Sequence, residues 1–235
     1  MKGGIHSDPE RLTAACVLSI IGGFLDIYTY LYRGKVFANA VTGNMVLFGL
    51  NLAERNWLAS GRYLLAILSY ALGVFVAEIV HGKLPDGRKI SWNQTVILLE
   101  ILCLLPVCFI PYGEFDFIVN SLISFVCALQ VQTFRKVHGL PFASTMCTGN
   151  LRSGTEALFH SWKKRMPGEF TKAMHYYGVI VCFIFGAAAG AILLGMLGHF
   201  IFLLIPLGLL AVFFLITPKR QIVIWRNRLR ALFGK

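Results

Sequence analysis

Long apolar runs, separated by short polar segments, dominate the chain. Six of them are long enough to cross a membrane, at approximately 12–32, 62–81, 93–111, 116–134, 173–197 and 199–217. An α-helix rises about 1.5 Å per residue, so about 20 residues cover the ~30 Å hydrocarbon core of a bilayer. The pattern therefore predicts an all-α integral membrane protein with six transmembrane helices.

Two shorter apolar stretches, 42–53 and 148–159, each begin with the tripeptide Thr-Gly-Asn. As helices they would rise only ~18 Å, about half of a membrane. We expect two half-helices that enter the bilayer without crossing it. Thr and Asn are residue types that cap the free N–H groups at a helix start, so we expect the tripeptides to cap these helices.

The shared tripeptide belongs to a longer internal repeat. Ser19, Gly34 and the Phe-Ala pair at 37–38 recur 105 residues later, and Thr-Gly-Asn recurs 106 residues later. Each half reads as a long span, a loop, a half-helix and two further spans, at about 12–111 and about 116–217. Self-similarity of this kind indicates a repeat architecture. We therefore expect one transmembrane domain over 1–217, built from two repeats.

Charge gives the expected orientation. The chain has 22 Lys and Arg against 11 Asp and Glu, a net charge of +11. If the half-helices do not cross, 18 of these basic residues fall on one side and four (Arg33, Lys35, Arg55 and Arg62) on the other. The positive-inside rule then places both termini in the cytoplasm. Three crossings per repeat turn the second repeat upside down, and inverted repeats with broken helices place binding sites near the midplane.

Other sequence features concern possible partners. The basic segment 218–235 has apolar residues at helical spacing, which predicts an amphipathic cytoplasmic tail on anionic membrane lipids rather than a nucleic-acid site. Gly186 and Gly190 form a GxxxG pattern, which permits close packing either within the chain or in a homo-oligomer. The six cysteines form no CxxC pair, so we expect no metal and no cofactor.

The residues around the tripeptides carry a family resemblance. GGFLD at 22–26, Tyr28 and FANAVTGN at 37–44 form a first signature, while TFR at 133–135 and TGNLRS at 148–153 form a second. Together they resemble the YoaK family of bacterial membrane proteins over most of the chain. The resemblance implies a six-span, multi-pass protein of the bacterial inner membrane. It implies little about mechanism, because the family is a domain of unknown function in which transport is suspected rather than established.

The stretches 37–44 and 142–150 are candidates for a binding site. Irregular backbone at membrane depth is tolerated only where protein buries it or water lines it. If both half-helices start near the midplane, their positive dipole ends converge there and favour an anion or a polar group. The expected solute-binding residues are Asp26, Asn39, Thr42, Gly43, Asn44, Gln130, Gln132, Thr148, Gly149, Asn150 and Arg152. The alternative is that Thr-Gly-Asn only caps two interfacial helices.

Charged residues within the spans leave alternatives open. Asp26 is expected to line a pore with Gln130 and Gln132, or to make a structural hydrogen bond to a neighbouring helix. Glu100 lies among leucines and is either a functional carboxylate or a structural one. Arg152 either offers positive charge to an anionic solute, or reaches the headgroups or pairs with the glutamate four residues later.

These features favour a membrane transporter or channel-like protein for a small polar or anionic solute. A non-transporting membrane scaffold and an intramembrane enzyme are the alternatives. The sequence contains no HExxH or GxSxG pattern and no cluster of His, Asp and Glu inside the expected spans. We therefore do not expect an enzyme.

Overall fold

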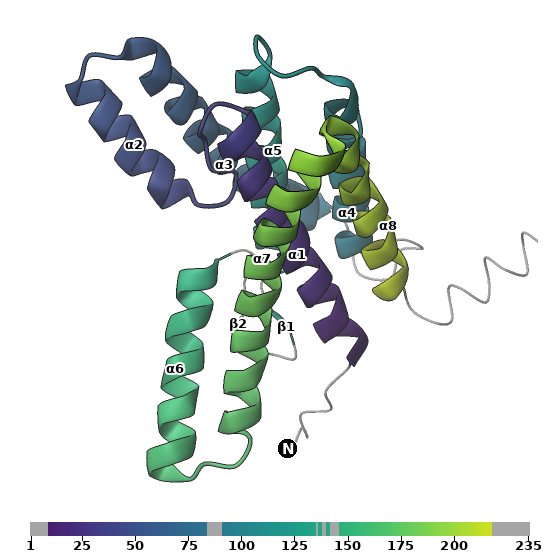
Figure 1. Ribbon diagram of the computed structural model, residues 1–235. Helices are drawn as coiled ribbons and strands as arrows, with labels where there is room; N and C mark the ends of the chain where they lie inside the picture. The colour runs from purple at the N-terminus through teal and green to yellow at the C-terminus, as the bar shows by residue number, and fades with distance from the viewer. Residues whose placement is uncertain (1–8, 84–90, 135, 138–139, 142–145, 218–235) are drawn as a thin grey trace, which may run out of the picture.

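The computed structural model describes residues 9–83, 91–134, 136–137, 140–141 and 146–217, and this part of the chain is almost entirely helical (Figure 1). In chain order its helices are α1 (Pro9–Tyr32), α2 (Val41–Ala53), α3 (Trp57–Lys83), α4 (Trp92–Leu104), the 3-10 helix η1 (Pro106–Phe109), α5 (Asp116–Thr133), α6 (Cys147–Lys164), α7 (Glu169–Leu197), the 3-10 helix η2 (His199–Leu203) and α8 (Leu204–Leu215). Two short strands, β1 (Lys136–Val137) and β2 (Leu140–Pro141), pair antiparallel between α5 and α6. The expected amphipathic tail at 218–235 lies outside the described residues.

Within the described ranges, five helical segments are long and apolar enough to cross a membrane. They are α1, α3, α5, α7 and the segment that α4 forms with η1. Large apolar side chains such as Leu68 and Phe75 on α3, and Ile184 and Phe185 on α7, are exposed. Lipid is the environment in which such helix surfaces are stable. The described fold is therefore an α-helical membrane protein with five candidate spans and several shorter helices.

Two segments differ in length from the sequence prediction. The last expected span, 199–217, is a shorter apolar unit made of η2 and the 12-residue α8. In contrast, α6 has 18 residues and rises ~27 Å, while the sequence predicted a half-helix over 148–159. The prediction ended where the apolar residues end. The helix continues to Lys164 because one face packs on α7 along its length, so the opposite face can be polar.

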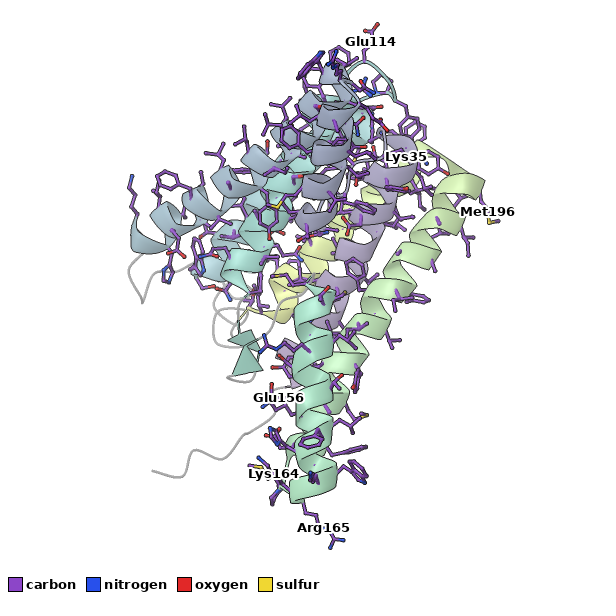
Figure 2. The ribbon with its side chains drawn as sticks, turned by 90° about the vertical axis from the view of Figure 1, so that its left-hand side faces the viewer. Lys35, Glu114, Glu156, Lys164, Arg165 and Met196 are labelled. Carbon is purple, nitrogen blue, oxygen red and sulfur yellow. The ribbon has the colours of Figure 1, made fainter. Side chains whose placement is uncertain are left out.

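The helices form two hairpins around a central group. α1 packs against α7 and α8, and α6 packs alongside α7. α5 packs against α3 and α4, and α2 packs alongside α3. α4 and α8 pack against each other and join the two sets. The α2–α3 hairpin and the α6–α7 hairpin project in different directions (Figure 1). Lys164 and Arg165 mark one end of the molecule and Glu114 marks the other (Figure 2).

Glycine allows two of these helix pairs to touch through their backbones. A Cβ atom at Gly186 of α7 would lie 2.1 Å from the backbone oxygen of Ile20 in α1. A Cβ atom at Gly73 of α3 would lie 2.4 Å from the backbone oxygen of Phe125 in α5. The GxxxG pattern at Gly186 therefore packs within the chain, which was one of the two alternatives that the sequence left open.

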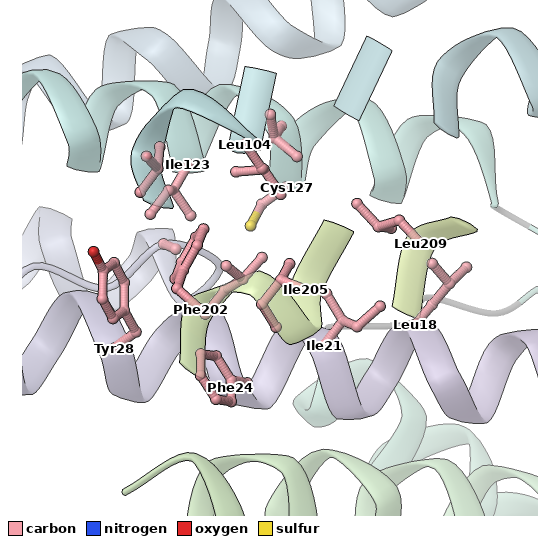
Figure 3. Close-up of a cluster of buried hydrophobic side chains, with 14 of the residues drawn as sticks. Leu18, Ile21, Phe24, Tyr28, Leu104, Ile123, Cys127, Phe202, Ile205 and Leu209 are labelled. Carbon is pink, nitrogen blue, oxygen red and sulfur yellow. The ribbon is translucent and has the colours of Figure 1, made fainter. Parts of the chain in front are cut away.

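The largest cluster of buried apolar side chains joins both halves of the chain (Figure 3). Leu18, Ile21, Phe24 and Tyr28 of α1 face Ile123 and Cys127 of α5, with Leu104 of α4 and with Phe202, Ile205 and Leu209 of η2 and α8. The rings of Phe24 and Phe202 meet edge to face with centroids 6.4 Å apart. Neither half can bury these surfaces alone, so the core forms only when the two halves pack together.

Arg33 is buried at the end of α1, although it was expected only as one of the basic residues of a loop. Its guanidinium donates to Asp116 Oδ1 (2.8 Å), to the Tyr28 hydroxyl (2.8 Å) and to the backbone oxygens of residues 110 and 111 (2.6 Å each). It also lies over the ring of Tyr112, with Cζ 4.6 Å from the centroid. In the turn outside the spans, burial raises the pKa of Tyr112 and the Arg33 charge opposes that rise. Arg33 therefore fastens α1 to the α4–α5 connection.

Candidate functional site

The loop before α2 is fastened to α1 by Asp26 and Asn39. Asp26 Oδ1 accepts the backbone N–H of Asn39 at 2.7 Å, and the backbone amides of Ala38 and Ala40 also face this carboxylate. The Asn39 side chain donates to the backbone oxygen of Gly22 at 3.1 Å. Asp26 is 8% exposed. Its carboxylate therefore lies at the positive end of α2 and occupies the position that an external anion would take there.

Asn44 closes the same loop from the side of α2. The backbone N–H of Phe37 donates to Asn44 Oδ1 at 2.9 Å, and Asn44 Nδ2 donates to the backbone oxygen of Phe37 at 2.6 Å. The side chain is fully buried. Gly43 lies against the Phe37 ring, where a Cβ atom would be 3.2 Å from Cδ2. Asn44 and Gly43 thus shape the entry loop, which explains their place in the tripeptide.

The tripeptides do not cap the helices. α2 begins at Val41 after Ala40, and α6 begins at Cys147 after Met146, and neither cap residue makes a side-chain cap hydrogen bond. Thr42 and Thr148 are instead the second residues of the two helices, and both are exposed. The prediction of Thr or Asn caps is wrong because each helix starts one residue before the tripeptide. This leaves the threonine hydroxyls available on the surface of each first turn.

The start of α6 lies near Asp26. Cys147, the first residue of α6, is close enough to Asp26 for the two side chains to interact electrostatically. Asn150 is 2% exposed, as its counterpart Asn44 is buried, whereas Gly149 is exposed and a Cβ atom there would meet nothing within 4 Å. Figure 1 shows α2 and α6 both starting near the middle of the molecule. The structure therefore brings the beginnings of α2 and α6 to one region near Asp26.

Gln130 and Gln132 point to different neighbours. Gln130 is 2% exposed and donates to the backbone oxygen of Leu18 in α1 at 3.4 Å. Gln132 hydrogen-bonds Glu78 of α3. Residues two positions apart lie on nearly opposite sides of a helix, so these glutamines face two separate helix interfaces. Only Gln130 is on the side of α5 that faces α1.

Arg152 is exposed on α6. The glutamate four residues later, Glu156, lies 3.7 Å from Nε2 of His160. Glu156 was one of the expected partners of Arg152, but in the structure it lies next to His160 instead. Arg152 therefore offers a positive charge at the surface of α6 rather than inside the bundle.

Cys127 and Ser124 of α5 belong to the same region, although their sequence context did not indicate it. Cys127 of α5 interacts with the side chains of Asp26, Glu100 and Asn39, and its sulfur points from α5 into the core (Figure 3). Ser124 lies one turn earlier and is fully buried. A cysteine and a serine in an apolar run look like small packing residues, so no sequence signal separates them from their neighbours.

Glu100 is the second buried carboxyl of this region. It is 0% exposed, and neither carboxyl oxygen has a hydrogen-bond partner within the described part of the chain. The same holds for the Asn39 Oδ1 and Ser124 Oγ atoms. Native interiors leave few polar atoms unsatisfied, so a group of them indicates a place for water or a polar ligand. No three His, Cys, Asp or Glu side chains of the described ranges group as a metal site.

Comparison with known proteins gives two matches. A family model described as "Protein of unknown function (DUF1275)" matches residues 14–216. The "UPF0700 transmembrane protein YoaK" of Bacillus subtilis (strain 168) is 29% identical over 146 residues, which is 61% of this chain and 65% of that relative. The match thus spans slightly less than two thirds of the relative's length. No solved structure matches the chain.

Proposed function

The chain belongs to the DUF1275 family of membrane proteins, in agreement with the resemblance of its sequence to the YoaK family, and from this premise we propose that it is a transporter or channel-like protein for a small polar or anionic solute. One observation carries the proposal: the loop before α2 hydrogen-bonds Asp26, and the first residue of α6 is close enough to interact electrostatically with the same carboxylate. Two re-entrant helix starts at one interior position are typical of solute sites in transporters and channels.

The packing of the helices supports two inverted repeats. Exchanging α1, α2, α3 and α4 for α5, α6, α7 and α8 leaves every major packing pair in place: α1–α7 becomes α5–α3, α2–α3 becomes α6–α7, and α4–α5 becomes α8–α1. Individual contacts follow the same exchange. Gly73 touches the Phe125 oxygen and Gly186 touches the Ile20 oxygen, and Phe125 lies 105 residues after Ile20, the spacing of the repeat.

Six crossings follow if η2 and α8 form the sixth, as α4 and η1 form the third of the first repeat. The distribution of basic residues then places both termini on the cytoplasmic side of a bacterial inner membrane. In the same arrangement the segment 218–235 lies against anionic lipids. A homo-oligomer remains compatible with the exposed apolar surfaces of α3 and α7.

The two helix starts differ in what they offer a solute. Asp26 already supplies a negative charge to the start of α2, so an anion there would be repelled unless Asp26 is neutral. At the start of α6, Thr148 and Gly149 are exposed, and the open space around Gly149 lets a solute approach the backbone. We therefore place the first polar contacts of the solute at α6, with Asp26 opposite.

Labelling tests the inverted arrangement. Arg55 follows α2 and Lys164 ends α6, and both are exposed. In a cysteine-free variant of the full chain, single cysteines at these two positions should react with a membrane-impermeant maleimide from opposite sides of intact cells or inverted vesicles. Modification of both positions from one side would exclude inversion of the repeats.

Flux measurements test transport. Proteoliposomes would be given inward gradients of glycerol, urea, formate or nitrate, and swelling would be followed by light scattering. Wild-type protein should admit at least one solute faster than protein-free vesicles do. If none of a broad panel of small neutral and anionic solutes enters faster, transport as proposed here is wrong.

Asn44→Leu should reduce that flux to the level of protein-free vesicles while the protein remains membrane-inserted. The change removes both hydrogen bonds to the Phe37 backbone and leaves buried groups unpaired, at a cost of about 1–3 kcal/mol each. Asn150→Leu should act alike at α6. Asn51→Leu is the matched control, because Asn51 is on the same helix and, among the described residues, its side chain hydrogen-bonds the backbone oxygen of Leu47 within α2 itself. Normal flux in the Asn44 and Asn150 variants would remove both residues from the site.

A further inference from the structure

Glu100 is held in an environment that fits a neutral carboxylic acid. It shares one face of α4 with Ile97 and Leu104, three and four positions away, and all three are fully buried. Ionised carboxylates in apolar surroundings are strongly destabilised unless donors or cations surround them. Within the described chain, Glu100 has no hydrogen-bond donor and no ion pair. These surroundings favour the protonated form of the Glu100 carboxyl.

A row of polar side chains leads from Glu100 to the solute region. Cys127 of α5 is near both carboxyls, since its side chain interacts electrostatically with Glu100 and with Asp26. Asn39 interacts with Cys127 and also donates its backbone N–H to Asp26. Unsatisfied atoms of Asn39 and Ser124 accompany this row, so water entering here would find hydrogen-bond partners along its length.

We propose that the Glu100 carboxyl is a proton-binding site of the transport cycle and exchanges its proton with the solute region beside Asp26. The inference rests on the proposed function and deepens it by naming the coupled ion. The O–H bond of Glu100 breaks, the proton passes to a water molecule and the carboxylate keeps the electron pair; on return, hydronium restores the acid. The ionised form requires water around Glu100, so proton release favours a hydrated conformation over the closed one.

Few other titratable groups face this carboxyl. On its own helix Cys103 interacts with it, and from α5 Cys127 does so. α3 contributes Tyr70, which interacts with Cys127, while α8 contains no titratable residue. α1 contributes Asp26 behind Cys127, and Glu78 of α3 is engaged by Gln132. His81 of α3 lies against Trp92 at the other end of α4. Among the described residues, Glu100 and Asp26 are the two carboxyls that interact with Cys127.

Infrared difference spectroscopy on the full chain in lipid tests the proton site. Wild type should show a carboxylic-acid C=O band that loses intensity at alkaline pH, returns on acidification and shifts in D2O. Glu100→Gln, which preserves the shape of the neutral acid, should lack this band. Glu156→Gln, an exposed carboxyl on α6, should retain it. A band unchanged in Glu100→Gln, or one that responds neither to pH nor to D2O, would overturn the proposal.

A second measurement needs no variant. A hydrophobic carbodiimide reacts with protonated carboxyls in membranes, so mass spectrometry should find Glu100 modified at neutral pH and progressively less modified as the pH rises. Exposed Glu156 serves as the internal reference and should remain largely unmodified. Absence of modification at Glu100 under conditions that modify Glu156 would contradict a protonated Glu100.

Coupling is tested with any solute that enters the proteoliposomes. An imposed pH gradient should accelerate wild-type flux, and Glu100→Gln should lose this acceleration. An equal response of the variant would overturn the coupling role. Absence of flux for every solute would instead count against the proposed function, and the infrared titration would still decide whether Glu100 exchanges a proton.

Discussion

Replacing Arg33 with methionine is expected to lower the free energy of unfolding by about 3 kcal/mol, the lower end of the range for breaking a buried ion pair. The change leaves Asp116 and two backbone oxygens without the guanidinium that now binds them. The lower end applies because Asp116 keeps 20% of its side chain exposed, so water replaces part of the lost interaction. Urea unfolding in detergent, followed by tryptophan fluorescence, measures the change.

Two further variants isolate the cause. Arg62→Met removes an exposed arginine from the start of α3 and should change stability by less than about 0.5 kcal/mol. The double variant Arg33→Met with Asp116→Leu removes both charges and should be more stable than Arg33→Met alone, because no carboxylate is then left unpaired. An effect of Arg33→Met no larger than that of Arg62→Met would show that the buried network does not stabilise the fold.

The membrane-crossing helices could be predicted closely because their signal is simple. A run of apolar residues about 20 long specifies a span whatever its neighbours are, and α1, α5 and α7 follow the predicted limits within a few residues. α6 shows where this signal ends. Its last five residues, 160–164, continue as helix because α7 supports one face of α6, and that support comes from residues distant in sequence.

The two helix starts could be picked out from the sequence, but the hydrogen bonds around them could not. The repeated tripeptide pointed to the two helix starts, and both lie in the region of Asp26. The bonds from Asn44 to the Phe37 backbone depend on a non-periodic loop conformation, which no residue pattern specifies. Cys127 was missed for a related reason: its interactions with two carboxyls arise only when α1, α4 and α5 pack together.

The position of Asp26 connects the proposed site with the proposed proton. A carboxylate at the start of α2 stabilises the entry loop, yet it also weakens the attraction of that helix end for an anion. Transfer of a proton to Asp26 would remove this negative charge and strengthen binding of an anionic solute at the neighbouring start of α6. Glu100 is a second buried acid that interacts with Cys127, so in the proposed cycle the two carboxyls together would provide a route for charge compensation.

Alanine at Gly73 or at Gly186 is expected to destabilise the protein by about 3 kcal/mol, the upper end of the usual cost of overpacking. The added methyl group would overlap a backbone oxygen of the neighbouring helix, Phe125 in one case and Ile20 in the other. A backbone cannot change rotamer to make room, so the helices must move apart. Unfolding in urea, measured as for the arginine variants, gives the size of the effect.

Each substitution has a matched control on its own helix. Gly61 of α3 and Gly178 of α7 have nothing within 4 Å of an added Cβ atom. Alanine there should leave stability unchanged or raise it by up to about 1 kcal/mol, because alanine favours the helix over glycine. If the two repeats are equivalent, Gly73→Ala and Gly186→Ala should lose stability by similar amounts. A large loss in one and none in the other would mean that the α1–α7 and α3–α5 contacts are not counterparts, and the pseudo-twofold arrangement of the site would lose its structural support.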